Sequence, residues 1–157
     1  MYYEEISFLP HVPDRLIDDL TTIRARGNLF DPQYEHFYSC FLVSRELKIF
    51  LQNYFEHTIN ARYQVITAQL PIHVDAGGLI SKYNYLLDTG GDAVETRWWD
   101  SVTNPKTVVY KHCAPLKHWH KLTTDIPHDI TPVARPRISI EIHMPKNDYV
   151  TDIMPDE

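Results

Sequence analysis

The sequence has few cysteines, few glycines and no long hydrophobic run. Its two cysteines, Cys40 and Cys113, are too few for a disulfide framework and form no Cys-X-X-Cys metal motif, which favours a reducing, cytoplasmic environment. Five glycines in 157 residues exclude a collagen-like chain. No segment approaches the ~18 apolar residues of a membrane span, and the first ten residues carry two glutamates and no basic region typical of an export signal. We therefore expect no membrane contact.

The sequence also lacks an excess of basic residues. Fifteen lysines and arginines against 21 aspartates and glutamates give a formal net charge of −6, which argues against binding along a phosphate backbone. An apolar fraction of 43%, with 12% aromatic residues, is sufficient for a sizeable core in a chain of ordinary domain length. We expect one domain over residues 1–157, and nucleic acid is not its expected partner.

Helical patterns are confined to the first third of the chain. The segment Pro13–Ala25 begins with Pro-Asp, which suits a first helical turn, and it carries an apolar stripe. Ser44 can cap a second helix, because apolar residues recur at helical spacing from Leu47 to Phe55. The two segments predict a helical layer within residues 13–57.

From residue 58 onward, short runs of β-branched and aromatic residues are separated by turn residues, which is typical of strands. Eight strands are predicted, at 61–67, 71–75, 82–87, 94–99, 107–113, 119–123, 128–133 and 137–143. Strands that follow helices, rather than alternate with them, favour a jelly roll or barrel whose outer face packs on the helices. The expected fold is mainly β, with a core at about residues 59–144 and a polar tail at 146–157.

Residues that can carry chemistry lie in the strand half. His73 and Asp75 are two positions apart, so on a strand they project from one face and could hold one cation. His128 follows, and nine residues later comes Arg137. Arg137 and Ser139 share one face of the last predicted strand, while three isoleucines share the other. An inward Arg137 would need an anionic partner, because an unpaired guanidinium is costly to bury.

This order of residues resembles the Fe(II)/2-oxoglutarate-dependent oxygenases, whose core is a double-stranded β-helix, a form of jelly roll. The resemblance is closest to their prolyl-hydroxylase-like branch and extends over about residues 72–142. Besides the His-X-Asp and later histidine, it rests on a Tyr-Leu sequence, a Gly-Gly pair, an acidic-Thr pair and an Arg-X-Ser triplet. These are Tyr85-Leu86, Gly90-Gly91, Glu95-Thr96 and Arg137-Ile138-Ser139.

The resemblance implies a role for each matching residue. His73, Asp75 and His128 would form the catalytic metal triad that holds Fe(II), leaving adjacent positions for 2-oxoglutarate and O2. The distal carboxylate of 2-oxoglutarate would be bound by the residues Arg137, Ser139 and Tyr85. The implied activity is that of a dioxygenase, and more specifically a hydroxylase, that couples conversion of 2-oxoglutarate to succinate with oxidation of a prime substrate.

The prime substrate is expected to be a peptide or protein segment rather than a small molecule, because the short chain leaves few residues for a covering lid. Tyr83 and Trp98 are candidate substrate contacts, although paired aromatics such as Trp98 and Trp99 are also common in packing. The stretch from Lys106 to Lys121 has four lysines, three histidines and no acidic residue. It is either a solvated rim or an edge for an anionic ligand. Nothing in the sequence indicates an oligomeric state.

Two other interpretations stay open. A β-helix domain that kept the scaffold without turnover would be a binding or accessory module. A cupin-like metal site could instead use His118 and His120, which would also share a strand face. The residues that follow that pair are Thr123 and Thr124 rather than a carboxylate, and only His128 has an arginine at the matching distance. The first triad is therefore favoured.

Overall fold

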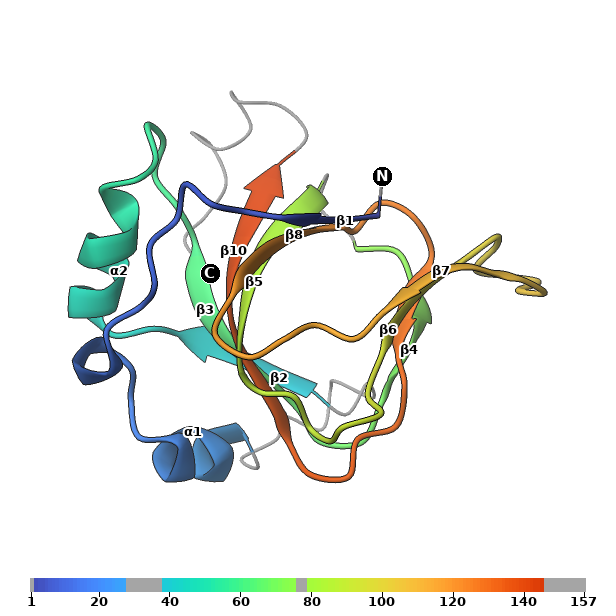
Figure 1. Ribbon diagram of the computed structural model, residues 1–157, viewed down its shortest axis with the longest axis horizontal. Coiled ribbons are helices and arrows are strands. Elements are labelled where there is room, and N and C mark those ends of the chain that lie inside the picture. The colour runs from blue at the N-terminus through green and yellow to red at the C-terminus, as the bar shows by residue number, and fades with distance from the viewer. Residues whose placement is uncertain (1, 28–37, 76–78, 146–157) are drawn as a thin grey trace.

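The computed structural model of the chain describes residues 2–27, 38–75 and 79–145. Figure 1 shows strands arranged in two layers, with helices on one side. The strands are β1 (Tyr3–Glu5), β2 (Tyr38–Leu42), β3 (Ala61–Ile66), β4 (Leu70–His73), β5 (Leu79–Asp88), β6 (Thr96–Trp99), β7 (Val108–His112), β8 (Trp119–Thr123), β9 (His128–Ile130) and β10 (Arg137–Pro145), and the α-helices are α1 (Leu20–Gly27) and α2 (Arg45–Gln52).

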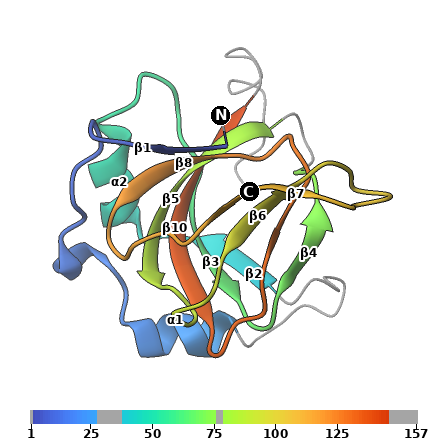
Figure 2. The ribbon, with the colours of Figure 1, turned by 45° about the vertical axis from the view of Figure 1, so that its right-hand side comes forward.

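The strands form two antiparallel sheets. A six-stranded sheet has the order β1-β8-β5-β10-β3-β2, and a four-stranded sheet has the order β4-β9-β6-β7. From β3 to β6 and again from β7 to β10, each strand lies in the sheet opposite to the one before it. Figure 2 shows the four-stranded sheet facing the six-stranded one. The fold is therefore mainly β and jelly-roll-like, as the sequence predicts.

The helices cover the outer face of the six-stranded sheet (Figure 1). Ile23 of α1 and Leu47 of α2 join one buried hydrophobic cluster with Ile138 and Ile140 of β10. Because side chains alternate along a strand, Arg137 and the other odd-numbered residues of β10 face the space between the sheets. Packing on the helices thus leaves β10 free to present a polar row to the interior.

The first predicted helix differs from the structure. In place of one helix over residues 13–25, a short 3-10 helix at Asp14–Leu16 is separated by a break from α1. At the break, the backbone N–H of Asp18 donates a hydrogen bond to the Tyr63 hydroxyl at 3.0 Å. A tertiary contact to β3 therefore replaces a helical hydrogen bond, which local periodicity does not predict.

The second predicted helix is confirmed as α2. The Ser44 hydroxyl accepts a hydrogen bond from the backbone N–H of Leu47 at 3.2 Å, which is the expected cap. The helix ends at Gln52, before Phe55. Neither α1 nor α2 is long and apolar enough to cross a membrane, and the same holds for the other described helical residues.

The eight predicted strands correspond to β3 through β10, whereas β1 and β2 were not predicted. Both are edge strands of the six-stranded sheet, and β1 has only three residues, two of them glutamates. The predicted polar tail at 146–157 lies outside the described residues.

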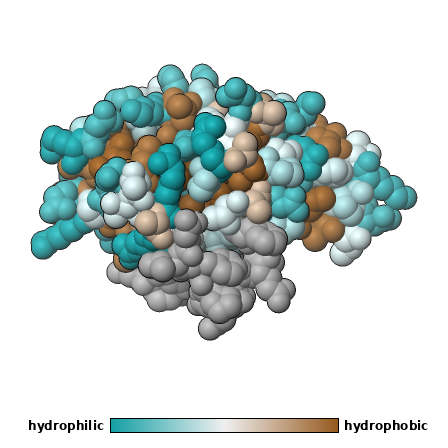
Figure 3. Space-filling view, turned by 90° about the horizontal axis from the view of Figure 1, so that it is seen from below, coloured by the Kyte–Doolittle hydropathy of each residue, from teal (hydrophilic) through white to brown (hydrophobic). Residues whose placement is uncertain are grey.

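The β6–β7 hairpin projects from the body of the molecule (Figures 1 and 2). Its exposed hydrophobic residues are Val102, Val108, Val109 and Tyr110. Figure 3 shows separate hydrophobic groups at the right-hand end of the molecule, the side on which this hairpin lies. The turn of the hairpin follows directly after Trp98 and Trp99, and Trp98 is the partner of His128 on β9. The hairpin therefore projects from the end of the four-stranded sheet where β9 begins.

Candidate active site

His73, Asp75 and His128 converge in the structure. His73 ends β4, His128 begins β9, and the two are direct partners across the strands. The Asp75 Oδ1 atom lies 3.2 Å from His73 Nε2 and 3.4 Å from His128 Nε2. One ligand atom from each residue lies within 4.8 Å of the other two. Within the described ranges, these three form the one such group of histidine, cysteine or acidic side chains.

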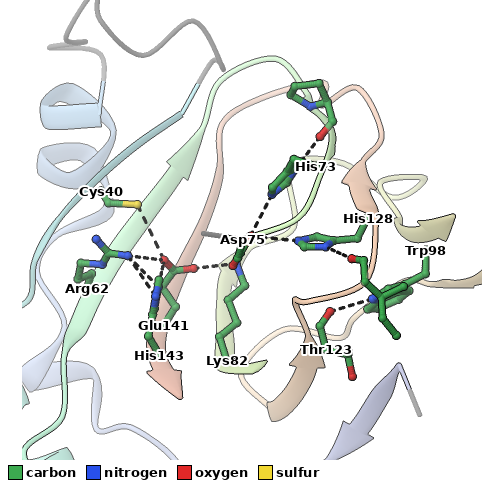
Figure 4. A network of polar contacts seen from close by, with 12 residues as sticks. Cys40, Arg62, His73, Asp75, Lys82, Trp98, Thr123, His128, Glu141 and His143 are labelled. Atoms are coloured by element: carbon green, nitrogen blue, oxygen red, sulfur yellow. Dashed lines mark hydrogen bonds and ion pairs between the residues drawn. The ribbon is translucent and has the colours of Figure 1, made fainter. Parts of the chain in front are cut away.

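Backbone carbonyls orient both imidazole rings. His73 Nδ1 lies 2.6 Å from the carbonyl oxygen of Pro71, and His128 Nδ1 lies 2.7 Å from that of Ile126. A carbonyl oxygen only accepts hydrogen bonds, so each Nδ1 carries the proton and donates it. Each Nε2 is then left as the atom directed at Asp75, as Figure 4 shows. This is the arrangement that metal-binding histidines typically adopt.

The electrostatics of the triad suit a divalent cation. Burial alone would raise the pKa of Asp75, but its contacts with the side chains of His128 and His73 and the charge of Lys82 lower it well below its usual range. The carboxylate is therefore ionised at neutral pH. Two imidazoles and one carboxylate on one side of an ion leave its other positions open, which is typical of non-haem Fe(II) sites. The donor set thus fits the Fe(II) that the family resemblance implies.

A cavity of about 20 Å³ lies between the sheets beside His128. It is lined by Gln64, Ile66, Leu70, Lys82, Asn84, Thr96, Leu122, Thr124, His128, Ile130, Arg137 and Ser139. The lining holds two cations, Lys82 and Arg137, and no acidic residue. Its volume is about that of one water site, so a larger ligand would require lining side chains to move.

Arg137 is the deeper of these two cations and is only 4% exposed. Its Nη1 donates a hydrogen bond to the backbone carbonyl of Thr89 at 2.9 Å. Burial lowers the pKa of Arg137 to about 10, so the guanidinium stays charged at neutral pH. No ion pair joins Arg137 to an acidic side chain in the part of the chain that the structure describes. A buried, charged guanidinium that lacks a carboxylate partner and lines a cavity fits an anionic ligand.

The structure places Ser139 and Arg137 together in the cavity lining, on the interior face of β10. Asn84 and Thr124 line the same cavity, and each has a buried oxygen atom with no hydrogen-bond partner, Oδ1 and Oγ1 respectively. Such atoms indicate a space that a polar ligand or water would complete. Sequence reasoning missed both residues, because neither belongs to a recognisable motif.

The structure corrects the assignments of Tyr85 and Tyr83. Lys82 and Asn84 of β5 line the cavity, so the two tyrosines, which alternate with them, face the cluster beneath the helices. The Tyr85 hydroxyl accepts a hydrogen bond from the backbone N–H of Val12 at 3.3 Å. The structure therefore places both side chains away from the cavity, which does not fit the predicted contacts of Tyr85 with the co-substrate and of Tyr83 with the substrate. Both faces of β5 are covered, so alternation alone did not show which face is interior.

Trp98 is a neighbour of the triad but has no accessible surface. Its side chain is 0% exposed, and its indole Nε1 donates to the carbonyl of Thr123 at 2.9 Å. Its ring also packs against Tyr2 and Tyr110, with centroids 5.8 Å and 5.7 Å away. This burial does not fit the predicted substrate contact and makes Trp98 a packing residue beside His128.

The alternative histidine pair is not brought together. His118 is exposed and precedes β8, whereas His120 is buried within it. Burial lowers the pKa of His120 to about 4, and its Nε2 lies 3.4 Å from the Asn84 amide nitrogen. His120 is therefore a neutral core residue at pH 7. The cupin-like interpretation gains no support from this geometry.

A buried charged network lies beside the triad (Figure 4). Lys82 Nζ lies 3.0 Å from Glu141 Oε2, and Glu141 is 1% exposed. His143 Nε2 lies 2.9 Å from the other carboxylate oxygen, and Arg62 Nη2 lies 3.7 Å from that same oxygen. Sequence reasoning missed this network, although Glu141 and His143 continue the alternation of Arg137 and Ser139 along one strand.

Neither a protein-family model nor a curated protein sequence matches this chain. Among solved structures, a prolyl-4-hydroxylase from Pseudomonas putida is similar, with a TM-score of 0.57 and 12% identity over 92% of each chain. An oxidoreductase of the 2OG-Fe(II) oxygenase family from Burkholderia pseudomallei aligns over 67% of this chain and 54% of its own, with a TM-score of 0.45 and 13% identity. The first similarity shows that this chain shares its overall fold with the P. putida prolyl-4-hydroxylase.

Proposed function

We propose that the protein is an Fe(II)- and 2-oxoglutarate-dependent dioxygenase that acts as a hydroxylase. The proposal rests on one observation: the space between the two sheets holds both a candidate metal site and a candidate co-substrate site. The first is the triad of His73, Asp75 and His128, whose ligand atoms lie within 4.8 Å of one another. The second is the cavity beside it, in which Arg137 is buried without an acidic partner among the described residues.

We also propose that the fold is a double-stranded β-helix. The alternation of strands between the two sheets supports this assignment, because such a fold winds the chain repeatedly from one sheet to the other. In this fold, His73 lies at the end of β4, His128 at the start of β9 and Arg137 on the last strand, β10. Residues 1–157 would form one domain, with α1 and α2 on its outer face.

Two groups of residues would bind the metal and the co-substrate. His73, Asp75 and His128 would hold Fe(II), which when bound supplies oxidation by O2 coupled to conversion of 2-oxoglutarate to succinate. The carbonyls of the residues two before each histidine keep the Nδ1 protons in place, so that Nε2 stays available as a ligand. Arg137 would bind the distal carboxylate through its guanidinium, and Ser139 would add a hydroxyl donor.

For the prime substrate, we propose a peptide or protein segment. His73 has 32% of its side chain exposed, so the triad can be reached from solvent. The β6–β7 hairpin, which begins next to His128, carries four exposed hydrophobic residues that a bound peptide could contact. Both observations favour a substrate that does not require complete burial. The formal charge of −6 makes nucleic acid the weaker candidate.

Succinate release tests the proposal. The purified chain would be incubated with Fe(II), 2-oxoglutarate and O2, alone and with proline-containing peptides, free amino acids or single-stranded oligonucleotides. We expect succinate formation that needs Fe(II) and O2 and that is lost in His128→Ala. Tight binding of metal and 2-oxoglutarate without succinate under any of these conditions would instead identify a binding module that lacks turnover.

A further inference from the structure

Lys82 is the second cation of the cavity, and the proposed function assigns it no role. It lies on β5 and lines the cavity together with Arg137 and His128. Figure 4 shows its side chain extending toward Asp75 and Glu141. Burial alone would lower the pKa of Lys82, but the charges of Glu141 and Asp75 outweigh burial and raise that pKa. A fully charged ammonium therefore lies beside the metal triad.

The anions around Lys82 are shared with other groups. Glu141 contacts Lys82 at 3.0 Å, but it also contacts His143 and lies near Arg62. The charge of Asp75 would be committed to a bound metal. The cavity lining itself contributes two positive charges and no negative one. Lys82 already has Glu141 as a partner, whereas Arg137 has no acidic partner among the described residues, so its buried charge is costly unless an anion enters the cavity.

The two cations enter the cavity from different places on the interior. Arg137 is the first residue of β10, and it pairs with Ile66 at the end of β3. Lys82 lies near the start of β5, where its partner on β10 is His143. The two residues therefore approach the shared cavity from opposite ends of the β5–β10 ladder. A ligand with one negative group at each end would match this arrangement better than a ligand with a single charge.

We propose that Lys82 is the second anchor of a dicarboxylate ligand, binding the carboxylate next to the metal triad while Arg137 binds the distal one. This inference rests on the proposed function and adds one positioning residue to it. The side chain suits the task, because its four-carbon stem is flexible and its ammonium has three donors. One donor can stay on Glu141 while the others turn to the ligand. Movement of this stem would also enlarge a cavity that otherwise has room for about one water.

The experiment compares two probes of equal length. Glutarate has a carboxylate at each end, and pentanoate has only one. Binding of each to the full chain would be measured by isothermal titration calorimetry, first with Zn(II) and then after chelation of the metal. We expect the parent to bind glutarate about tenfold or more tightly than pentanoate, since a charge-assisted contact has this magnitude. Lys82→Met should remove that preference and leave pentanoate affinity within about twofold.

Three further variants separate recognition from folding. Lys82→Met removes one of the partners of the buried Glu141, so Lys82→Met/Glu141→Gln removes both charges and should lose the same preference. Glu141→Gln alone keeps the lysine and should keep the preference. Lys48→Met changes a partly buried lysine of α2, remote from the cavity, and should bind both probes like the parent. Thermal unfolding and Zn(II) titration of each variant report folding and the metal site.

The outcomes distinguish this inference from the proposed function. If both variants lacking Lys82 fold and bind glutarate within about twofold of the parent, the role of Lys82 is overturned. Succinate release and the effect of Arg137→Met on 2-oxoglutarate binding would still support the enzyme in that case. If Arg137→Met also leaves glutarate binding unchanged, the cavity is not a dicarboxylate site and both ideas fail.

Discussion

His73 and His128 face each other as direct partners of β4 and β9, with ring centroids 4.4 Å apart. Each ring is fixed by a carbonyl two residues earlier in its own chain segment. The backbone of two paired strands therefore orients both Nε2 atoms, without help from a distant side chain. A site oriented in this way needs little rearrangement to accept a metal.

Replacing His128 tests the metal site. His128→Ala removes one of three ligands, so we expect affinity for Co(II) or Zn(II) to fall by more than about 100-fold, beyond the effect usual for residues that only support a ligand. His118→Ala is the matched control, because His118 is exposed and should leave affinity unchanged. Competition with a chromophoric chelator measures both. Equal affinity in the two variants would contradict the triad.

Replacing Arg137 tests the co-substrate pocket. Arg137→Met removes a charge-assisted contact, so the free energy of 2-oxoglutarate binding should weaken by about 1.5–3 kcal/mol. Metal affinity should stay the same, since Arg137 is no ligand of the triad. Arg135→Met is the matched control, because Arg135 pairs with Asp88 at 2.9 Å. Calorimetry that finds the larger loss in Arg135→Met would move the anchor to that residue.

The position of Tyr85 leads to a different expectation for its hydroxyl. Tyr85→Phe removes a partner of the Val12 N–H but no group from the cavity. We expect the free energy of unfolding to fall by about 1 kcal/mol, as for a typical lost hydrogen bond, with 2-oxoglutarate affinity unchanged. Urea unfolding and calorimetry test the two parts separately. A loss of affinity with unchanged stability would restore the role that the family resemblance implies.

His120 should make stability depend on pH. Its pKa is lowered from 6.5 to about 4 by burial, so the unfolded chain takes up a proton at a pH where the folded chain does not. Stability is therefore fully present above pH 6.5 and falls as the pH drops toward 4, by about 2 kcal/mol at pH 5.

Urea unfolding of the parent and of His120→Asn at pH 7 and pH 5 isolates this contribution. All other titrating groups are common to both proteins, so their effects cancel in the comparison. The parent should lose about 2 kcal/mol more than the variant between the two pH values. An identical loss in both would show that His120 is protonated in the folded state.

The sequence alone predicts which residues of the last strand, β10, share a face. Ile138, Ile140 and Ile142 alternate with Arg137 and Ser139, and the structure places the two sets on opposite faces as predicted. Alternation succeeds here because the two faces differ sharply in polarity. His73 and Asp75 also come together as predicted, although Asp75 lies just after the end of β4 rather than on the strand.

For β5, the sequence alone does not predict which face lies between the sheets. This strand carries tyrosines on one face and Lys82 and Asn84 on the other; the tyrosines and Asn84 are buried and Lys82 is partly buried. Which face lies inside depends on where β8 and β10 pair with it, and that is a property of the whole fold. The break before α1 has the same origin, because the hydroxyl of Tyr63 that meets it lies far away in sequence.

The placement of β10 between β3 and β5 also bears on how the protein is made. β3 begins at Ala61, yet its partner strand begins only at Arg137, so the central ladder of the larger sheet joins segments far apart in the chain. Pairings of this kind close large loops and form slowly. During synthesis, His73 and Asp75 leave the ribosome well before His128 and the strand that carries Arg137. Any metal bound by this triad is therefore acquired late, after nearly the whole described chain has been translated.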